Sequence, residues 1–350
     1  MLEAGDDVVA AADLEAKEGK AERHALEGFL ERAGKVDAAG VRVVHGGPAF
    51  RSSTRVDARV LNRLDAVSEL APLHNPPALA AMRELRRLRP RLPVIACFDT
   101  AFHSSLPAEA FTYAVPAEWS RRWGVRRYGF HGLSHAYASR RAAELTGARL
   151  VVTCHLGSGA SLAAVREGVS VDTTMGFTPM EGLVMATRSG SIDPGLVLWV
   201  QRRHGLSAAQ VERILDRESG LLGLAGSADM RALLKRVERG RRSARLAVDV
   251  YLHRLRASIA AMAAALGGLE ALVFTGGVGE NAPLIRQRAC AGLGFLGLQL
   301  DATRNRDPHG DADISERGSP VRLLVVKARE DIEIARETRA VFKVLRASAG

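Results

Sequence analysis

Residues 150–165 decide the fold, and they read LVVTCHLGSGASLAAV. The apolar runs 150–154 and 162–165 favour β-structure, and Gly157 and Gly159 lie between them. Two such runs predict a β-hairpin whose turn lies close to a ligand, because glycine lets backbone N–H groups approach without interference from a Cβ atom. Successive N–H groups of this kind bind phosphate. A hairpin turn that binds nothing is the alternative interpretation.

The composition is that of a globular protein large enough for two domains. The chain has 350 residues, of which 47% are hydrophobic and 25% charged, whereas single cores tend to stop growing near about 250–300 residues. No apolar run of about 18 residues occurs, and the first residues have no signal-peptide pattern, so we expect a cytoplasmic protein. Three cysteines, Cys97, Cys154 and Cys290, lack metal-ligand spacing and are expected in the core.

The net charge of +10 admits nucleic acid, an acidic membrane or small anionic substrates as partners. The densest basic segment, Arg83–Arg91, also carries leucines at helical spacing, which predicts the solvated face of an amphipathic helix. Aromatic residues of the kind that stack on bases are not interleaved with these arginines. We therefore expect small anions as partners, and neither nucleic acid nor a membrane.

Strand signals begin only after residue 40. Residues 1–40 show one short helical pattern near residues 25–30, preceded by a tail of disordered composition. A strand is predicted at Val41–His45, and an arginine inside it, Arg42, needs a functional reason. A helix is predicted over 56–70, and three prolines predict an extended, rigid segment at 71–77 before a helix over 78–89.

A carboxylate follows the next predicted strand, Val94–Phe98. Asp99 stands directly at the end of this apolar run. Open α/β sheets place functional groups at the carboxyl ends of their strands, so Asp99 is a candidate catalytic residue. A helix cap or turn cap is the alternative interpretation.

Two histidines, His131 and His135, lie four residues apart in the segment 128–135. That spacing alone could indicate zinc, but no glutamate or third ligand accompanies the pair, and we do not assign a metal to it.

The second half of the chain repeats the strand-to-glycine pattern. The apolar run 271–275 leads into Gly-Gly-Val-Gly-Glu-Asn at 276–281, a loop of the phosphate-cradling type. The polar, turn-rich segment 172–194 is longer than a connector requires, which is typical of functional loops. Helices are expected over 208–216, 243–266 and 331–345, with a strand at 321–326.

Taken in series, these motifs resemble the acetate kinase family, within the actin, Hsp70 and sugar kinase superfamily. The matching motifs are Arg-Val-Val-His-Gly-Gly at 42–47, Ala-Pro-Leu-His-Asn-Pro-Pro at 71–77, Phe-Asp-Thr-Ala-Phe-His at 98–103, Tyr-Gly-Phe-His-Gly at 128–132, the hairpin, Met-Gly-Phe-Thr-Pro at 175–179, Gly-Ser-Ile-Asp-Pro at 190–194 and Thr-Gly-Gly-Val-Gly-Glu-Asn at 275–281. Each motif alone is weak, but their common order is specific.

The resemblance implies a two-domain α/β protein with the actin-like (ribonuclease H-like) ATPase fold. The first, acetate-side domain would comprise residues 1–102 and 331–350, and the second, nucleotide-binding domain residues 103–330. It also implies a homodimer that forms through the second domain. The implied reaction is reversible ATP-dependent phosphorylation of acetate to acetyl phosphate, with Mg²⁺ or Mn²⁺ as cofactor.

The resemblance also implies the roles of individual residues. The implied catalytic residues are Asp99, His131, Arg188 and Arg42. The implied substrate-binding residues are Arg42, Val44, His74, Leu73, Phe130 and Pro179. The implied nucleotide-binding residues are His155, Leu156, Gly157, Ser158, Gly159, Asp229, Met230, Arg231, Gly277, Val278, Gly279, Glu280 and Asn281. Glu330 is the implied metal ligand. Since acetate is already ionised at neutral pH, Asp99 is expected to orient an arginine or a magnesium-bound water rather than act as a base.

Three departures from the family pattern stand out. Ser158 and Arg329 each occupy a position where the family commonly has asparagine. No segment of residues 1–40 resembles the family's first phosphate loop, of the type Asn-Ala-Gly-Ser-Ser-Ser-x-Lys. The resemblance therefore implies a first domain without its opening strands and an exposed edge at residues 41–45. Either the true start lies upstream of Met1, or the product is impaired, and the 350-residue chain is expected to have low activity.

Other functions stay open at this point. A propionate or butyrate kinase differs only in the volume of its substrate pocket, where one methylene discriminates by about 1–3 kcal/mol. A non-catalytic relic that still binds nucleotide through the second domain is a further alternative, and a nucleic-acid-binding role rests on charge alone.

Overall fold

The computed structural model describes residues 2–4, 7–10, 16–17, 20–21 and 23–347. These divide into two compact units. Unit 1 contains the described residues up to Ser104, Phe130–Tyr137 and the residues from Arg329 onward, and unit 2 contains Ser105–Gly129 and Ala138–Ala328. The segment Phe130–Tyr137, which the resemblance assigned to the second domain, thus clusters with unit 1.

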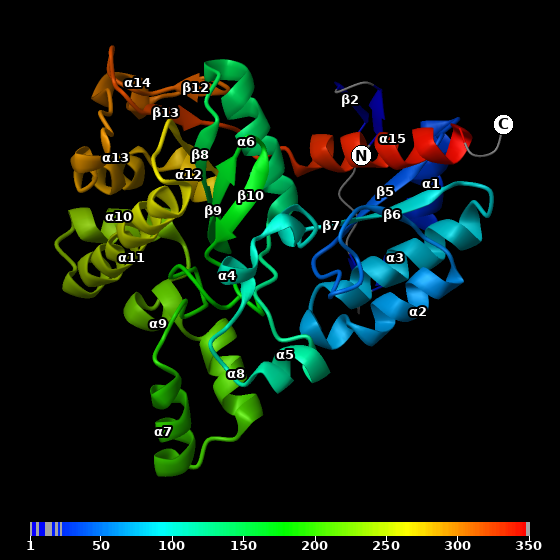
Figure 1. Ribbon diagram of the computed structural model, residues 1–350, viewed down its shortest axis with the longest axis horizontal. Coiled ribbons are helices and arrows are strands. Elements are labelled where there is room, and N and C mark those ends of the chain that lie inside the picture. Colours follow the sequence, from blue (N-terminus) through cyan, green and yellow to red (C-terminus); the bar gives the residue numbers. More distant parts are fainter. Residues whose placement is uncertain (1, 5–6, 11–15, 18–19, 22, 348–350) are drawn as a thin grey trace. The chain divides into compact units, whose positions relative to one another are not determined.

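Unit 1 is built on a three-stranded sheet in the order β5-β7-β6 (Figure 1). Its elements are β1 (Leu2–Ala4), β2 (Asp7–Ala10), β3 (Ala16–Lys17), β4 (Lys20–Ala21), α1 (Arg23–Ala33), β5 (Ala39–Val43), β6 (Thr54–Arg55), α2 (Ala58–Ala66), η1 (Ser68–Leu70), α3 (Asn75–Leu88), β7 (Val94–Phe98) and α15 (Glu330–Ala347). The strands β5 and β7 are parallel, and β5 forms one edge of this sheet. The four short strands before α1 form two antiparallel pairs that the sequence did not predict.

Strand β7 separates two layers of helices. All five of its residues are buried, and they alternate between the two faces. Val94, Ala96 and Phe98 pack with residues of α2 and α3, whereas Ile95 and Cys97 pack with residues of α15. This period of two is what a strand covered on both faces produces. Unit 1 is therefore a sheet between α15 on one face and the pair α2 and α3 on the other.

The approach of α15 to β5 is close because of one glycine. A Cβ atom at Gly40 would lie 2.3 Å from Oγ1 of Thr338 and 2.6 Å from Cγ2 of Ile334, both on α15. The lack of a side chain at this position lets the helix lie directly on the strand. The start of α15 is thereby held beside the end of β5.

The prediction of an extended segment over 71–77 is wrong. Helix α3 already begins at Asn75, with Pro76 and Pro77 in its first turn. Proline is tolerated there because the first N–H groups of a helix have no intrahelical partner. The helix predicted over 56–70 is likewise divided, into α2 and η1.

Unit 2 contains a six-stranded mixed sheet in the order β10-β9-β8-β11-β13-β12. Its strands are β8 (Leu150–Leu156), β9 (Ala160–Arg166), β10 (Val169–Thr173), β11 (Ala271–Thr275), β12 (Ala312–Asp313) and β13 (Arg322–Val325). Its helices are α4 (Ala108–Phe111), α5 (Ala117–Trp123), α7 (Pro194–His204), α8 (Ala208–Arg217), α9 (Gly220–Ala225), α10 (Met230–Glu238), α11 (Arg242–Leu266), α12 (Gly276–Asn281), α13 (Pro283–Ala291), η3 (Gly294–Leu296) and α14 (Ala302–Arg306). The elements η2 (Phe102–Ser105) and α6 (Gly132–Thr146) contribute residues to both units.

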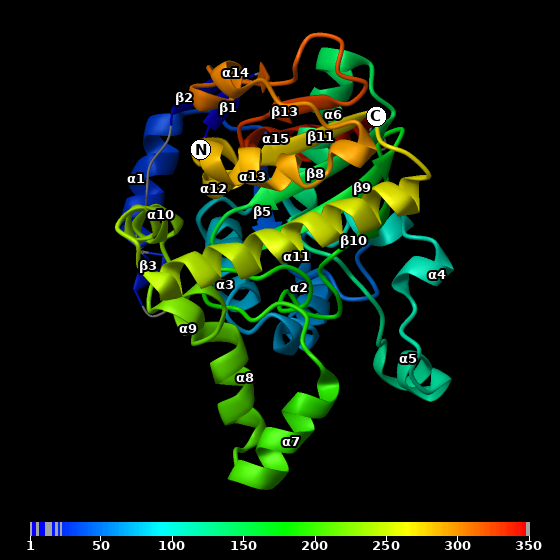
Figure 2. The same cartoon turned by 90° about the vertical axis from the view of Figure 1, so that its left-hand side faces the viewer.

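The predicted hairpin is confirmed as β8 and β9, which pair from Leu150↔Arg166 to Leu156↔Ala160. The predicted helix over 243–266 is confirmed as α11, which crosses this sheet and packs on it (Figure 2). The helix predicted over 208–216 is also confirmed, as α8, which begins with a capping box formed by Ser207 and Gln210. All three cysteines are free and buried, as predicted.

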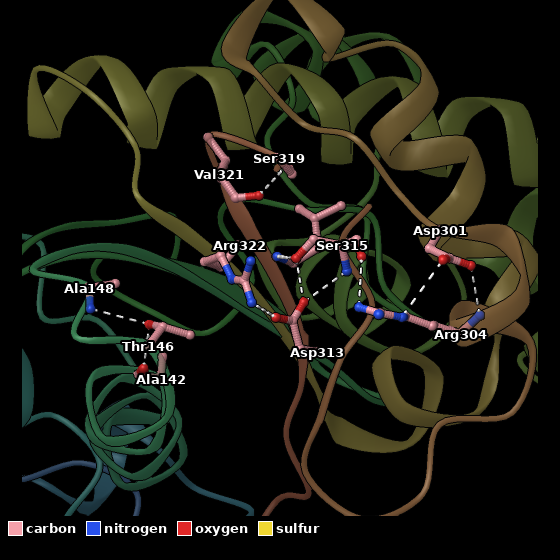
Figure 3. A network of polar contacts seen from close by, with 11 residues as sticks. Ala142, Thr146, Ala148, Asp301, Arg304, Asp313, Ser315, Ser319, Val321 and Arg322 are labelled. Atoms are coloured by element: carbon pink, nitrogen blue, oxygen red, sulfur yellow. Dashed lines mark hydrogen bonds and ion pairs between the residues drawn. The ribbon is translucent and has the colours of Figure 1, made fainter. Parts of the chain in front are cut away.

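A polar network fastens the β12 edge of this sheet (Figure 3). The Asp313 carboxylate accepts hydrogen bonds from the backbone N–H of Ser315 at 2.9 Å and from the Ser315 hydroxyl, and it pairs with Arg322. The Ser315 hydroxyl accepts from the backbone N–H of Leu323 at 3.0 Å, and Arg304 donates to the Ser315 carbonyl at 3.2 Å. These contacts tie the short strand β12 to β13 and α14.

No helix among the described residues combines the length and the apolar character that a membrane crossing requires.

Candidate active site

One arginine in unit 1 bridges two carboxylates. Nε of Arg42 donates to both carboxylate oxygens of Asp99 at 3.1 and 3.2 Å, and Nη2 lies 2.7 Å from Oδ2 of Asp99. Nη1 of the same guanidinium lies 2.8 Å from Oε2 of Glu330. We call Arg42, Asp99 and Glu330 the arginine centre.

Three elements of unit 1 supply the arginine centre. Arg42 lies in β5 opposite Cys97 of β7, and Asp99 directly follows β7 with its N–H bonded to the Val43 carbonyl at 3.0 Å. Glu330 is the first residue of α15. Because β5 and β7 are parallel, their carboxyl ends lie side by side. Functional groups of open α/β sheets gather at these strand ends. Asp99 is only 1% exposed.

The electrostatics of the arginine centre keep Arg42 charged. Burial lowers the pKa of the Arg42 guanidinium, but the hydrogen bond and charge of Asp99 and the charge of Glu330 outweigh burial and raise the pKa above its ordinary value. Burial raises the pKa of Glu330, and the positive charge of Arg42 lowers it. The negative charges of Asp99 and Asp331 raise it further, so the pKa of Glu330 lies above its ordinary value. Glu330 therefore takes up a proton at a higher pH than an exposed glutamate does.

His131 lies next to this centre in a strained backbone conformation. Its φ of +55° is in the left-handed region, which few residues other than glycine adopt. The N–H of Gly132 donates to the Asp99 carbonyl at 3.1 Å, and a Cβ atom at Gly132 would lie only 2.0 Å from that oxygen. A ring nitrogen of His103 is hydrogen-bonded to the Phe130 carbonyl at 3.1 Å. Strain that the surrounding contacts maintain is common at active sites.

The predicted substrate residues of unit 1 lie at the same ends of the strands. Val44 follows β5, and the neighbouring His45 contacts the Phe130 ring with centroids 5.3 Å apart. The side-chain amide of the buried Asn75 donates to the His45 carbonyl at 2.9 Å and accepts from the His45 N–H at 3.1 Å, and so holds the exposed Leu73 and His74 close to this strand end. Sequence reasoning missed Asn75, because the segment that carries it was expected to be extended.

The two glycine segments of unit 2 also end neighbouring strands. Strands β8 and β11 are parallel with His155 opposite Thr275, so Gly157–Gly159 and Gly276–Asn281 follow at the same sheet edge. A Cβ atom at Gly276 would lie 3.0 Å from the Leu156 carbonyl oxygen. The second segment, predicted as a loop, is the six-residue helix α12.

The remaining predicted nucleotide residues lie at the start of α10. The Asp229 carboxylate caps this helix by accepting a hydrogen bond from the Arg231 N–H at 2.8 Å. Met230 is buried, and Arg231 has 84% of its side chain exposed. In the first glycine turn, Ser158 is exposed and its carbonyl accepts from the Ala186 N–H at 3.1 Å. The structure assigns no ligand to these residues, and their role stays a prediction.

Arg188 lies in unit 2 and forms an ion pair with Asp216. Nε of Arg188 donates to Oδ1 of Asp216 at 3.0 Å, and Nη1 lies 3.4 Å from the Pro179 carbonyl. Pro179 and Arg188, predicted for substrate binding and catalysis, are thus neighbours. Asp216 belongs to the charged helix α8, and no pattern in the sequence distinguishes it from the other acidic residues there.

A second network holds the segment that contains Pro179. The Tyr113 hydroxyl donates to Oε2 of Glu181 and accepts from the Phe177 N–H at 2.9 Å. Arg127 pairs with Oε1 of Glu181 at 2.7 Å and donates to the carbonyls of Thr174 and Met175, both at 3.0 Å. The polar segment that sequence analysis assigned to function is therefore held in one conformation.

The chemistry of the arginine centre fits the implied Mg²⁺. Within the described part of the chain, no three His, Cys, Asp or Glu side chains gather as a metal cluster. Magnesium is usually held by one or two carboxylates together with substrate phosphates and water. The carboxylate of Glu330, of which Oε2 pairs with Arg42, offers an oxygen donor of this kind.

Comparison with known proteins decides the family. The model of the Acetokinase family matches residues 9–336. This chain belongs to the acetokinase family. The resemblance that its motifs indicated is thereby confirmed.

Individual relatives agree with this assignment. An acetate kinase of Gloeobacter violaceus is 51% identical over 309 residues, which is 87% of this chain and 76% of the relative. The crystal structure of an acetate kinase of Porphyromonas gingivalis matches with a TM-score of 0.86 and 37% identity over 91% of this chain and 84% of that one. A propionate kinase of Francisella tularensis matches with a TM-score of 0.86 and 38% identity over 91% and 83%. These structures confirm the predicted α/β actin-like fold of the acetokinase family.

The raised pKa of Glu330 leads to a prediction about its neighbour Asp331. We expect Asp331→Asn to lower the pKa of Glu330, because the replacement removes a negative charge that raises it and releases Arg329, whose guanidinium pairs with Asp331 at 2.8 Å. The measurement is a pH titration by carboxyl ¹³C NMR, with Glu330→Gln to assign the resonance. The exposed Asp65→Asn of α2 is the control, since Asp65 is not among the charges that act on Glu330. An unchanged or higher pKa of Glu330 in Asp331→Asn would contradict this account.

Proposed function

We propose that this chain transfers the γ-phosphoryl group of ATP to acetate in a reversible, direct in-line reaction that forms acetyl phosphate and ADP. The arginine centre beside the strained His131 carries this proposal. Phosphoryl transfer depends mainly on positioning and on neutralising charge. Two carboxylates hold the Arg42 guanidinium in a fixed position, which is the kind of positioning that this reaction requires in place of a covalent nucleophile.

In the proposed step, a carboxylate oxygen of acetate attacks the γ-phosphorus. The new oxygen–phosphorus bond forms as the bond to the bridging oxygen of the β-phosphate breaks, and ADP leaves with that electron pair. Arg42 and Arg188 bind the acetate carboxylate and the phosphoryl oxygens, and His131 donates to the phosphoryl group. Asp99 keeps Arg42 in place and abstracts no proton, because acetate is already ionised.

A bound Mg²⁺, held by Glu330, would neutralise the negative charge of the phosphates during transfer. Val44, Leu73, His74 and Phe130 of unit 1 are proposed to bind the acetate, and Pro179 of unit 2 is proposed as a further substrate-binding residue. The nucleotide is proposed to bind unit 2, at the glycine segments 157–159 and 276–281 and at Asp229–Arg231. Units 1 and 2 would then be the acetate-side and nucleotide-binding domains of a cytoplasmic enzyme.

The two arginines provide the test of this function. We expect Arg42→Ala and Arg188→Ala each to lower turnover by about 100-fold or more, because each removes charge-assisted hydrogen bonds to the transferring group. Hydroxylamine trapping of acetyl phosphate measures the rate. The exposed Arg59→Ala of α2 is the control and should retain wild-type turnover. Loss of circular dichroism together with activity would make these arginines structural residues and contradict the proposal.

Propionate is a second candidate substrate, favoured by the similarity to the Francisella tularensis propionate kinase. A hydrophobic pocket discriminates one methylene by about 10- to 200-fold. We expect kcat/KM to be higher for acetate than for propionate. The reverse order would make propionate the substrate and leave the phosphoryl-transfer chemistry intact.

We further propose that the protein is a homodimer through unit 2, as the resemblance implies. Helix α7 has no buried residue, and it exposes Leu196, Leu198 and Trp199 by 47–55%. Exposed apolar residues grouped in this way are typical of interfaces. We expect a dimer by sedimentation equilibrium at micromolar concentration and a weaker dimer in Leu198→Asp. A wild-type monomer, or a variant that dimerises equally well, would contradict this interface.

A further inference from the structure

A buried arginine in unit 2 holds the second glycine segment from behind. Arg286 lies on α13 and is 0% exposed. Its Nη1 donates to the carbonyls of Gly279 and Glu280 at 2.8 and 2.7 Å. Its Nε and Nη2 donate to Asn305, at 2.7 Å to the side-chain oxygen and at 2.6 Å to the carbonyl. One guanidinium thus connects α12 to α14.

The charge of Arg286 has only neutral oxygens around it. Among the residues that the structure describes, no carboxylate lies within ion-pair distance of Arg286, and its four acceptors are three carbonyls and one amide oxygen. Burial lowers the pKa of Arg286 to about 10, which still leaves it charged at neutral pH. Burying a cation without a counter-ion is unfavourable, so a fold gains little from such a residue through stability alone.

The carboxylate of Glu280 also holds segment 276–281 in place. Oε1 of Glu280 accepts hydrogen bonds from the N–H groups of Gly276 at 3.0 Å and Ala328 at 2.9 Å. The Asn281 side chain donates to the Gly277 carbonyl at 2.9 Å. Glu280, expected to bind nucleotide, therefore uses one carboxylate oxygen to connect the segment to its own first residue and to Ala328, three residues past the end of β13.

We infer that Arg286, together with Asn305, is a positioning residue for nucleotide binding, because it fixes the conformation in which segment 276–281 meets the nucleotide. This inference rests on the proposed function, in which that segment binds ATP and ADP. The planar guanidinium donates in several directions at once, which the compact ammonium group of a lysine cannot reproduce. The carbonyls of Gly279 and Glu280 both accept hydrogen bonds from Arg286, so the backbone of this segment is fastened to α13 through these two oxygens.

Asn305 completes the arrangement from α14. Its side-chain nitrogen donates to the Pro283 carbonyl at 2.9 Å, while its oxygen accepts from Nε of Arg286. The residue is 2% exposed. Replacing Asn305 by alanine removes one acceptor of Arg286 and the link to the start of α13, but leaves the arginine in the chain.

The test is calorimetric titration of the full chain with Mg-ADP. We expect Arg286→Lys and Asn305→Ala each to raise the Kd for Mg-ADP about tenfold or more, since each loses hydrogen bonds to a charged group. Arg288→Lys on the same helix is the matched control, because Arg288 is part-exposed and pairs with Asp249 at 2.6 Å. Its Kd should stay within about twofold of the wild-type value.

Thermal unfolding of the same samples separates positioning from stability. A purely structural role would lower the melting temperature of both variants but leave the Kd unchanged at a temperature where they are folded. That result, or the failure of both variants to fold, would overturn the inference. If only Arg286→Lys fails to fold, the Kd of Asn305→Ala decides. A wild-type chain that does not bind Mg-ADP would instead overturn the proposed nucleotide site and the inference with it.

Discussion

The contact between Arg42 and Asp99 is the interaction on which the rest of the proposed site depends. Asp99 is almost completely buried and its two oxygens are held by one guanidinium. Since 37% of the Arg42 side chain is exposed, the pair is part-buried, but removal of Arg42 would still leave the buried Asp99 carboxylate without this counter-charge. The parallel register of β5 and β7, the close approach of α15 at Gly40 and the bond from Gly132 to the Asp99 carbonyl all serve to keep this pair, Glu330 and His131 together.

The second constraint is the placement of two glycine segments at the ends of adjacent parallel strands in unit 2. Strands β8 and β11 bring residues more than 100 positions apart in the chain to the same sheet edge. Charged side chains then hold two segments in place. Segment 276–281 is held by Arg286 from α13 and by its own Glu280, and the segment around Pro179 is held by the pair of Arg127 and Glu181. A rigid binding surface made of glycine-rich backbone requires such supports, because glycine itself restricts the chain so little.

Local patterns predicted the parts of the fold that depend on neighbouring residues. The hairpin of β8 and β9, the strand before Asp99 and the helix α11 all follow from apolar periodicity. Pro76 and Pro77 were misinterpreted because proline both ends helices and begins them. Asp216, Asn305 and Arg286 could not be found from sequence, because their meaning comes from partners that lie 28 or 19 residues away. The family could be predicted from the order of the motifs along the sequence. The contacts of Asp216, Asn305 and Arg286 became visible only in the structure.

The central claim, that the arginine centre supports phosphoryl transfer between acetate and a nucleotide, is tested most directly by following the reverse reaction by ³¹P NMR. Purified chain is mixed with acetyl phosphate and Mg-ADP, and the β-phosphate resonance of ATP is recorded over time. The account predicts that ATP appears as acetyl phosphate disappears, and that Asp99→Asn, which removes one of the two carboxylates that hold Arg42, slows this conversion strongly. Formation of ATP at the same rate in wild type and variant, or none with the wild-type chain, would contradict it.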